Sequence, residues 1–397
     1  MRATFLLHTD MFRPSPIFRA VKEASALAHL GVLSTAVCWI KGTLDLPPSE
    51  TIDGVTVKRY VFQPSPQSLF HLVRRYRELR RVTRDLAALV AATHPDVIVA
   101  HDLEVLSAGV RAGAGRVPVV YDAHEDWPAM VGETSPIEGV FSSILERRLS
   151  RQVAAVVTPS ELIAEKFRAW GARAETLHNA PYEAEVEPLP TAADVAQIRE
   201  GLGVAGAFVL GYVGTLAPKR GLELAVEALA GLPHDVRFVV VGGPATEAER
   251  IRGLAQRAGV GDRVSLVGRV PRRDVSRYTA AFDLALVLPP PASRNYLTTL
   301  PNKAYDCMAV GVPILASDLP ALRRLIVDEA RAGIVVAPEV RAVREAIMDL
   351  RGNPGLLKEL GRNGLRAFRE TYAWEKQEPR FLALLRDIGV GPPFHDA

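Results

Sequence analysis

The sequence has very little cysteine. Its 397 residues include two, Cys38 and Cys307, which lie in apolar segments of different halves of the chain. Two cysteines so far apart support neither a disulfide framework nor a cysteine-based metal cluster. We therefore expect a protein of a reducing compartment, the cytoplasm.

Long hydrophobic runs are also absent. No segment reaches the roughly 18 uninterrupted apolar residues that a membrane-spanning helix needs. The N-terminal segment "MRATFLLHTD" has an apolar run too short for the core of a signal peptide. We expect the protein to remain in the cytoplasm, in one interpretation as a peripheral protein on the inner face of the membrane.

Charge of one sign is not concentrated in a block. The 48 basic and 45 acidic residues give a net charge of +3, and the basic residues are spread along the chain. This distribution gives no reason to expect a nucleic-acid partner. Residues 68–90 differ, because arginines fall between leucines and other apolar residues at helical spacing. Such a helix either buries one stripe against the protein or rests on anionic lipid.

Alternating strand and helix patterns fill both halves of the chain. Short runs such as "DVIVAHD" and "RFVVVGG" are rich in β-branched residues, end in turn residues and are separated by helical segments. This pattern predicts an α/β protein with two doubly wound parallel sheets. We expect one domain over residues 1–183, a linker over 184–206 that is rich in Pro, Glu and Ala, and a second domain over 207–373.

In doubly wound sheets, ligands bind at the carboxyl ends of the strands, so the loops that follow strands are the candidate sites. The first such loop of the second domain, "GYVGTLAPKRGLE", contains Gly214, Lys219 and Arg220 just before a helix. Glycine lets a ligand approach the backbone, and the cations can meet a phosphate at the helix N-terminus. The spacing does not match G-x-G-x-x-G, which disfavours a nicotinamide site.

Two later loops extend the same candidate site. In "VGRVPRRD", Arg269 and Val270 could flank a flat base. In "TTLPNKAYDC", Pro301 suits the first turn of a helix, which predicts free backbone amides near it and an anion site completed by Lys303. Asp306 lies one turn further on and could accept hydrogen bonds from a ribose diol. The amides expected to be free are those of Thr299, Leu300 and Asn302.

Taken together, these segments resemble the retaining GT-B glycosyltransferases, in particular the large family four (group 1). The resemblance is carried above all by "LPNKAYDCMAVGVPILASDLPAL", with "YVGTLAPKRGLE" before it and "VPVVYDAHEDWP" in the first half. It implies two Rossmann-like domains that face each other across a cleft. It also implies that the closing helix, residues 374–391, crosses back onto the first domain.

The resemblance assigns roles to individual residues. Arg220 and Lys303 match the cations that hold the donor diphosphate, and Asp306 matches the acid that binds the ribose. Thr215 stands where the family often has a phosphate-binding arginine, and Thr298 replaces a glutamate that touches the transferred sugar.

The first domain supplies the expected acceptor side. His124, in "DAHED", resembles the histidine that faces the sugar, and it could orient the donor sugar or an acceptor hydroxyl. His101 and Asp102 end a strand near it, and Arg13 is available for a charged acceptor. Since no second histidine or cysteine stands at ligand spacing beside His124, we expect no metal.

The implied activity is transfer of a sugar, with retention of configuration, from a nucleotide diphosphate sugar to a hydroxyl of a glycan, a lipid-linked acceptor or a small molecule. The donor is a co-substrate, and no cofactor is expected. A sugar-nucleotide epimerase, a two-lobed solute-binding protein and a catalytically idle relative stay open as alternatives, the last because of Thr298.

Overall fold

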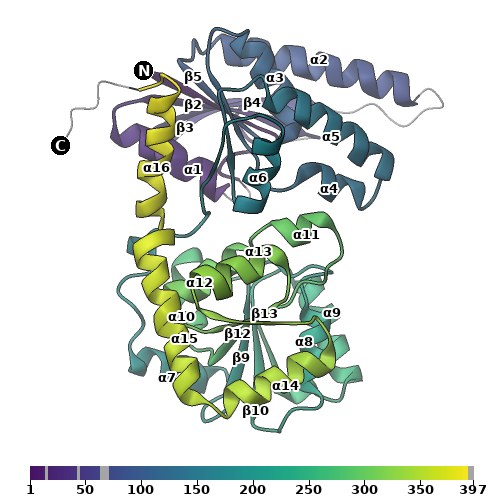
Figure 1. Ribbon diagram of the computed structural model, residues 1–397, viewed down its shortest axis with the longest axis vertical. Coiled ribbons are helices and arrows are strands. Elements are labelled where there is room, and N and C mark those ends of the chain that lie inside the picture. The colour runs from purple at the N-terminus through teal and green to yellow at the C-terminus, as the bar shows by residue number, and fades with distance from the viewer. Residues whose placement is uncertain (14–16, 43–44, 63–70, 392–397) are drawn as a thin grey trace. The chain divides into compact units, whose positions relative to one another are not determined.

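The computed structural model describes residues 1–13, 17–42, 45–62 and 71–391, with the backbone alone over 71–76. The chain forms two compact units (Figure 1). Unit 1 comprises Met1–Asn179 and the C-terminal segment from Glu378, and unit 2 comprises Ala180–Gln377.

Unit 1 is built on one sheet of eight strands in the order β3-β4-β2-β1-β5-β6-β7-β8. All neighbouring strands are parallel except β3 and β4, which are antiparallel. The edge strand β3 was not expected from the sequence, because it has only four residues and two of them are the polar Ser49 and Glu50. The strands are β1 (Arg2–Leu7), β2 (Leu33–Lys41), β3 (Ser49–Ile52), β4 (Val55–Phe62), β5 (Val97–His101), β6 (Val119–Asp122), β7 (Ala155–Thr158) and β8 (Ala174–Thr176).

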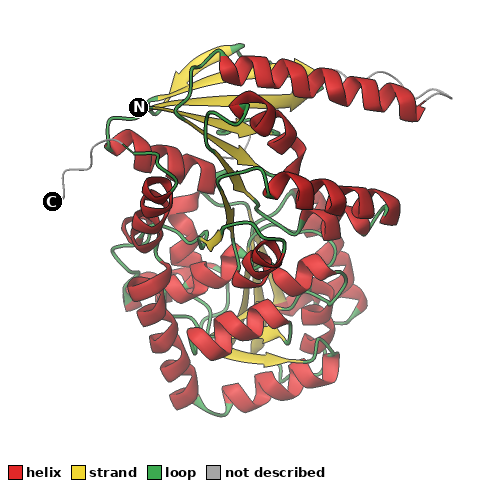
Figure 2. Cartoon of the chain, turned by 45° about the horizontal axis from the view of Figure 1, so that its top comes forward, coloured by secondary structure: helices red, strands yellow, loops and turns green. Residues whose placement is uncertain are grey.

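Both faces of this sheet are covered. Along β1, Phe5 and Leu7 enter one apolar core while Leu6 enters the other. Because successive side chains of a strand point to opposite faces, an uninterrupted apolar run fits a sheet buried on both sides. Figure 2 shows the strands flanked by helices. The helices are α1 (Phe18–His29), α2 (His71–Ala91), α3 (Leu103–Gly113), α4 (Trp127–Gly132), α5 (Pro136–Ser150), α6 (Glu161–Ala169) and α16 (Trp374–Asp387).

Helix α2 corresponds to the predicted basic helix, of which residues 68–70 lie outside the described residues. Its described side chains divide differently from the prediction. Val82, Leu86 and Val90 are buried, whereas Leu79, expected in the buried stripe, is 48% exposed. The inward stripe therefore runs through Val82, three residues after Leu79.

Unit 2 is built on a fully parallel sheet of six strands in the order β11-β10-β9-β12-β13-β14. All of them coincide with runs predicted as strands. They are β9 (Phe208–Val213), β10 (Val236–Val241), β11 (Val264–Gly268), β12 (Leu284–Val287), β13 (Ile314–Ser317) and β14 (Gly333–Val336). The predicted pair of doubly wound parallel α/β sheets is thus confirmed.

The helices of unit 2 include several that the sequence did not indicate. Residues 184–206, expected to be a linker, contain α7, which begins at a capping box formed by Thr191 and Asp194, and they cluster with unit 2. The helical segments are η1 (Glu183–Glu185), α7 (Ala192–Gly201), α8 (Leu222–Leu229), α9 (Ala245–Arg257), η2 (Gly261–Arg263), η3 (Arg272–Asp274), α10 (Val275–Thr279), α11 (Arg294–Thr298), α12 (Asn302–Ala309), α13 (Pro320–Arg323), η4 (Arg324–Glu329), α14 (Val340–Arg351), α15 (Pro354–Ala367) and η5 (Phe368–Tyr372).

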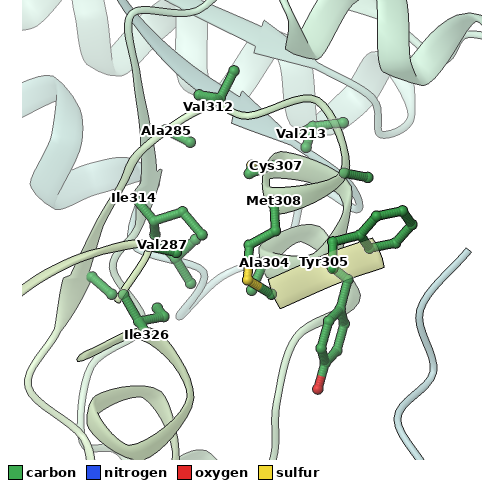
Figure 3. Close-up of a cluster of buried hydrophobic side chains, with 14 of the residues drawn as sticks. Val213, Ala285, Val287, Ala304, Tyr305, Cys307, Met308, Val312, Ile314 and Ile326 are labelled. Carbon is green, nitrogen blue, oxygen red and sulfur yellow. The ribbon is translucent and has the colours of Figure 1, made fainter. Parts of the chain in front are cut away.

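Helix α12 is fixed by one of the two cores of unit 2. Ala304, Cys307 and Met308 pack among side chains from β9, β12 and β13, as Figure 3 shows. With this face of the helix buried, Asn302, Lys303 and Asp306 are left on its less buried side. The core thereby sets where the polar residues of α12 stand.

Candidate active site

The strand order of unit 2 places its candidate site. The order in which the chain adds strands reverses between β9 and β12, so the connections after these two strands lead to opposite sides of the sheet. Such a switch point is where doubly wound sheets bind ligands. Residues 214–220 follow β9 and carry Arg220, and the segment after β12 leads to Lys303 at the start of α12.

The side chain of Lys303, from α12, packs against the end of β9. Its Nζ stands 3.3 Å from the centroid of the Tyr212 ring. The side chain also passes close to Gly214, where an added Cβ would lie 3.5 Å from Lys303 Cε, an ordinary contact distance. Burial, together with the positive charge of Arg220, lowers the pKa of Lys303 well below its ordinary value.

Arg220 is therefore near enough for its positive charge to disfavour the protonated form of Lys303. Within the described part of the chain, neither forms an ion pair with a carboxylate. Arg220 is exposed, and Lys303 is half-buried. Adjacent cations without carboxylate partners favour the binding of an anion, which would relieve their repulsion.

Gly221 holds the first loop against the sheet. Its φ is 82°, and a Cβ at this position would lie 2.1 Å from the carbonyl oxygen of Leu288, just after β12. The loop that ends with Arg220 thus touches the backbone at the end of the neighbouring strand, a contact that only glycine allows.

Replacing Gly221 by alanine is expected to destabilise the protein by about 3 kcal/mol or more, because the backbone contact with Leu288 must open. Gly259→Ala is the matched control, since its φ is +69° and nothing lies within 4 Å of an added Cβ. The control variant should lose only the stability that backbone strain costs, about 1–2 kcal/mol. Urea unfolding compares the two variants, and equal losses would contradict the close contact.

The start of α12 differs from the prediction in two respects. Pro301 is the residue before the first turn, and the helix begins at Asn302. The amide of Thr299 is not free, because it donates to the carbonyl of Asn295 at 2.9 Å and so ends the unpredicted helix α11. Among the described residues, no backbone carbonyl accepts from the amides of Leu300 and Asn302, which leaves these two predicted donors available.

Asp306 has a partner that the sequence did not indicate. Its Oδ1 lies 2.8 Å from Arg272 NH2, and Arg272 Nε lies 3.6 Å from Glu185. The residue predicted to bind the ribose is therefore already paired with an arginine in this structure.

The other predicted donor-site residues lie in the loops around these groups. Arg269 is exposed, and Val270 is half-buried against the core. Lys219 and Thr215 are exposed, and the Thr215 carbonyl accepts a hydrogen bond from the Tyr212 hydroxyl at 2.7 Å. Thr298 Oγ1 donates to the carbonyl of Arg294 at 3.0 Å.

Unit 1 has a switch point of its own, between β1 and β5. There the fold brings His101, at the end of β5, next to His124, which follows β6. His101 Nδ1 lies 3.0 Å from His124 Nε2. Asp122 Oδ2 lies 3.1 Å from the former atom and 3.2 Å from the latter.

Buried charges surround these histidines. Arg19 NH2 lies 3.0 Å from Asp122 Oδ1, and both side chains are buried. Burial opposes ionisation of Asp122, but Arg19 and the histidines hold its pKa well below the ordinary value. Burial raises the pKa of the nearby Glu23 well above its usual range, and Asp122 adds to that shift.

The two histidines differ in the direction of their pKa shifts and in exposure. Burial lowers the pKa of His101, whereas for His124 the carboxylates of Asp122 and Asp102 outweigh burial and raise the pKa. The side chain of His101 is 1% exposed, so its predicted contact with an acceptor is wrong for this structure, because it lies beneath His124. His124 is 21% exposed and is the accessible member of the cluster.

The other residues predicted on the acceptor side also have partners within unit 1. Asp102 has a φ of 68°, unusual for a residue other than glycine, and its carboxylate accepts the backbone N–H of His124 at 3.1 Å. Strained residues of this kind occur at functional sites. Arg13 forms a two-point ion pair with Glu50, at 3.2 Å in each contact.

His101, Asp122 and His124 have the donor types of a metal site, and their ligand atoms lie within 4.8 Å of one another. Sequence spacing missed this grouping because neighbouring parallel strands bring the two histidines together. Arg19 already neutralises Asp122 through the other carboxylate oxygen, which lowers its attraction for a cation. The contacts describe a network that orients His124.

Family models match both halves of the chain. The model described as "Glycosyl transferase 4-like domain" matches residues 19–183, and "Glycosyl transferases group 1" matches residues 207–353. The chain belongs to the group 1 glycosyltransferases.

Curated relatives of this glycosyltransferase are identical to it at about a quarter of the aligned positions. It is 27% identical over 286 residues to alpha-D-kanosaminyltransferase of Streptomyces kanamyceticus, which covers 69% of this chain and 72% of the relative. It is 26% identical to a D-inositol 3-phosphate glycosyltransferase of Xylanimonas cellulosilytica, over 58% of this chain and 56% of that one. A lipopolysaccharide core mannosyltransferase of Rhizobium leguminosarum is 28% identical, over 44% and 49%.

Solved structures share the GT-B fold of this glycosyltransferase. Sucrose-phosphate synthase of Thermosynechococcus elongatus aligns with a TM-score of 0.79 at 20% identity, covering 98% of this chain and 99% of that one. Anabaena Alr3699/HepE in complex with UDP aligns with a TM-score of 0.73 at 17% identity, covering 98% and 100%. In the described residues of the glycosyltransferase, no helix is both long enough and apolar enough to cross a membrane.

A buried histidine should make the folding stability of this glycosyltransferase depend on pH. Burial, with Arg380 and Arg19 nearby, lowers the pKa of His178 to about 3. The unfolded chain takes up a proton near pH 6.5 and the native protein does not, so His178 removes stability as the pH falls from about 6.5 towards 3. The loss approaches about 1.4 kcal/mol per pH unit within that window.

His178→Gln should therefore make urea stability less dependent on pH between 7.5 and 4.5. The exposed His29 serves as control, and His29→Gln should keep the wild-type dependence. Parallel pH profiles for wild type and His178→Gln would contradict the assignment.

Proposed function

We propose that this protein transfers a sugar from a nucleotide diphosphate sugar to a hydroxyl group, with retention of the anomeric configuration. The observation that carries the proposal is the pair of basic side chains, Arg220 and Lys303, at the switch point of unit 2, which form no ion pair with a carboxylate among the described residues. The relatives named above are sugar transferases, and the structurally similar Anabaena protein is known with UDP and with UDP-glucose.

The proposed chemistry rests on the leaving group. The bond between the anomeric carbon and the diphosphate oxygen breaks, and negative charge builds on the diphosphate. Arg220, Lys303 and the amides of Leu300 and Asn302 would stabilise that charge, which is the main task of catalysis at an already activated carbon. Asp306 would accept hydrogen bonds from the ribose, and Val270 with Arg269 would line the base.

Retention is proposed through attack from the face of the leaving group. The acceptor oxygen bonds to the anomeric carbon, and its proton passes to the departing phosphate oxygen. Thr298 carries no carboxylate, and its hydroxyl donates within α11, so it would not serve as the nucleophile of a double displacement. Nothing in this geometry or in the relatives favours the epimerase alternative.

His124 would orient the transferred sugar or the acceptor hydroxyl. Asp122 and His101 fix its ring, and its raised pKa favours the protonated form, which donates hydrogen bonds from both nitrogens. The acceptor could be a glycan, a lipid-linked molecule or a small metabolite. A charged acceptor would have to displace Glu50 from Arg13.

The experiment is a matrix of UDP-, GDP-, dTDP- and ADP-sugars against acceptors that include inositol 3-phosphate and simple glycosides. Release of the nucleotide diphosphate and the NMR coupling of the product's anomeric proton are measured together. We expect acceptor-dependent release with one nucleotide and a product of unchanged anomeric configuration. An inverted product would contradict retention, and an altered sugar nucleotide without acceptor would contradict transfer itself.

A further inference from the structure

Helix α5 exposes an apolar face. Among the described residues, eleven large hydrophobic side chains are exposed, and five of them belong to α5. Four are 61–71% exposed and the fifth is 40% exposed. They recur at the spacing that places side chains on one side of a helix. These residues, called the α5 stripe, are Ile137, Val140, Phe141, Ile144 and Leu145.

The inward face of α5 is polar and close-fitting. Glu146, fully buried, accepts hydrogen bonds from the Tyr121 hydroxyl at 2.8 Å and from Lys166 Nζ at 2.9 Å. Gly139 packs against α4, where an added Cβ would lie 2.8 Å from Gly132 Cα. These contacts fix the rotation of the helix, so the stripe points outward as a consequence of the fold.

Arginine side chains lie next to the α5 stripe. Arg147 and Arg148 follow its last residue and are exposed. At 100° per residue, Arg148 falls within the arc of the stripe and Arg147 at its border. Helix α2, which like α5 packs on α3, adds the exposed arginines Arg77 and Arg80 to the same unit (Figure 1).

We infer that the α5 stripe docks on an anionic lipid surface. A convex helix face with apolar side chains and flanking arginines matches an interfacial helix, whose apolar side enters the headgroup region while the cations meet lipid phosphates. A stable protein interface needs about 20–30 residues on each side, many more than the stripe offers. The contact is thus assigned to α5, in place of the helix at residues 68–90, for which the sequence left lipid contact open as an alternative.

The test is co-sedimentation of the full chain with sucrose-loaded vesicles, either of phosphatidylcholine alone or with about one third phosphatidylglycerol. We expect binding to the anionic vesicles that falls with salt, and at least tenfold weaker binding by Phe141→Gln/Ile144→Gln. Both side chains are mostly exposed, so this variant should fold, which circular dichroism checks. Leu33→Gln, at a 68% exposed position of the same unit outside the stripe, should bind like wild type.

Charge and self-association are separated by two further measurements. Arg147→Ala/Arg148→Ala should weaken binding to anionic vesicles, whereas Arg77→Ala/Arg80→Ala should weaken it less. Unchanged vesicle binding by Phe141→Gln/Ile144→Gln would overturn the inference. The inference would also be overturned if the wild-type chain bound neither kind of vesicle and formed a dimer in sedimentation velocity, while Phe141→Gln/Ile144→Gln was a monomer. That result would assign the stripe to contact with a second copy of the chain. Neither readout depends on the proposed sugar transfer.

Discussion

Replacing Arg220 by alanine is expected to lower turnover by a factor of about 10²–10³ with no comparable loss of stability. In the proposed reaction Arg220 meets the charge that develops on the departing diphosphate, and removal of one such preorganised donor has an effect of this size. Because Arg220 is exposed and forms no ion pair among the described residues, its replacement should cost the folded state little stability. Initial rates at saturating donor, with urea unfolding of the same preparation, give both numbers.

The control removes an arginine of the same unit that has no part in the site. Arg341 lies on α14, is 88% exposed and pairs with Glu345. Arg341→Ala should keep wild-type turnover within about a factor of two. Full activity in folded Arg220→Ala would remove this residue from the donor site.

Replacing Arg19 by methionine is expected to destabilise the protein by about 3–5 kcal/mol at pH 8, because the variant leaves a buried carboxylate without its cation. Arg19 is 1% exposed, pairs with Asp122 and donates to the carbonyl of Leu177 at 3.0 Å. The loss should be smaller at pH 5, where protonation of His124, whose pKa Asp122 and Asp102 raise, can supply the missing positive charge. Urea unfolding at the two pH values measures both effects.

The matched control is an exposed ion pair of the same unit. Arg173 and Asp387 lie 2.6 Å apart, with side chains 40% and 60% exposed. Arg173→Met should therefore cost less than about 1 kcal/mol. An Arg19→Met loss as small as that of the control, or one independent of pH, would contradict the buried network.

Sequence patterns were sufficient for most strands because doubly buried strands appear as continuous apolar runs. They were insufficient for β3, a short antiparallel edge strand, and for α7, whose polar surface gives no apolar stripe. The α5 stripe is the opposite case. Its spacing is typical of an inward face, yet the inward positions are occupied by Gly139 and Glu146. Gly139 packs against Gly132 of α4, and the partners of Glu146, Tyr121 and Lys166, come from other elements.

Within the candidate site, the sequence indicated residue types and the fold determined their partners. Arg220 and Lys303 were predicted from two separate loops. The effect of Arg220 on the pKa of Lys303 depends on the β9–β12 switch point, which brings the two loops together. The Arg272–Asp306 pair and the contact between His101 and His124 join segments far apart in the chain. Spacing alone carries no information about such contacts.

The measurement that tests the central claim most directly is a thermal-shift titration of the wild type and Lys303→Ala with UDP, GDP, dTDP and ADP. A ligand that binds the folded state must raise its stability, and 100-fold excess over Kd corresponds to about 2.7 kcal/mol, or about 3 °C for a chain of this length. We predict a shift with one nucleotide class, lost in Lys303→Ala and kept in Arg341→Ala. No shift with any diphosphate, or an equal shift in Lys303→Ala, would contradict a donor site built on this pair of cations.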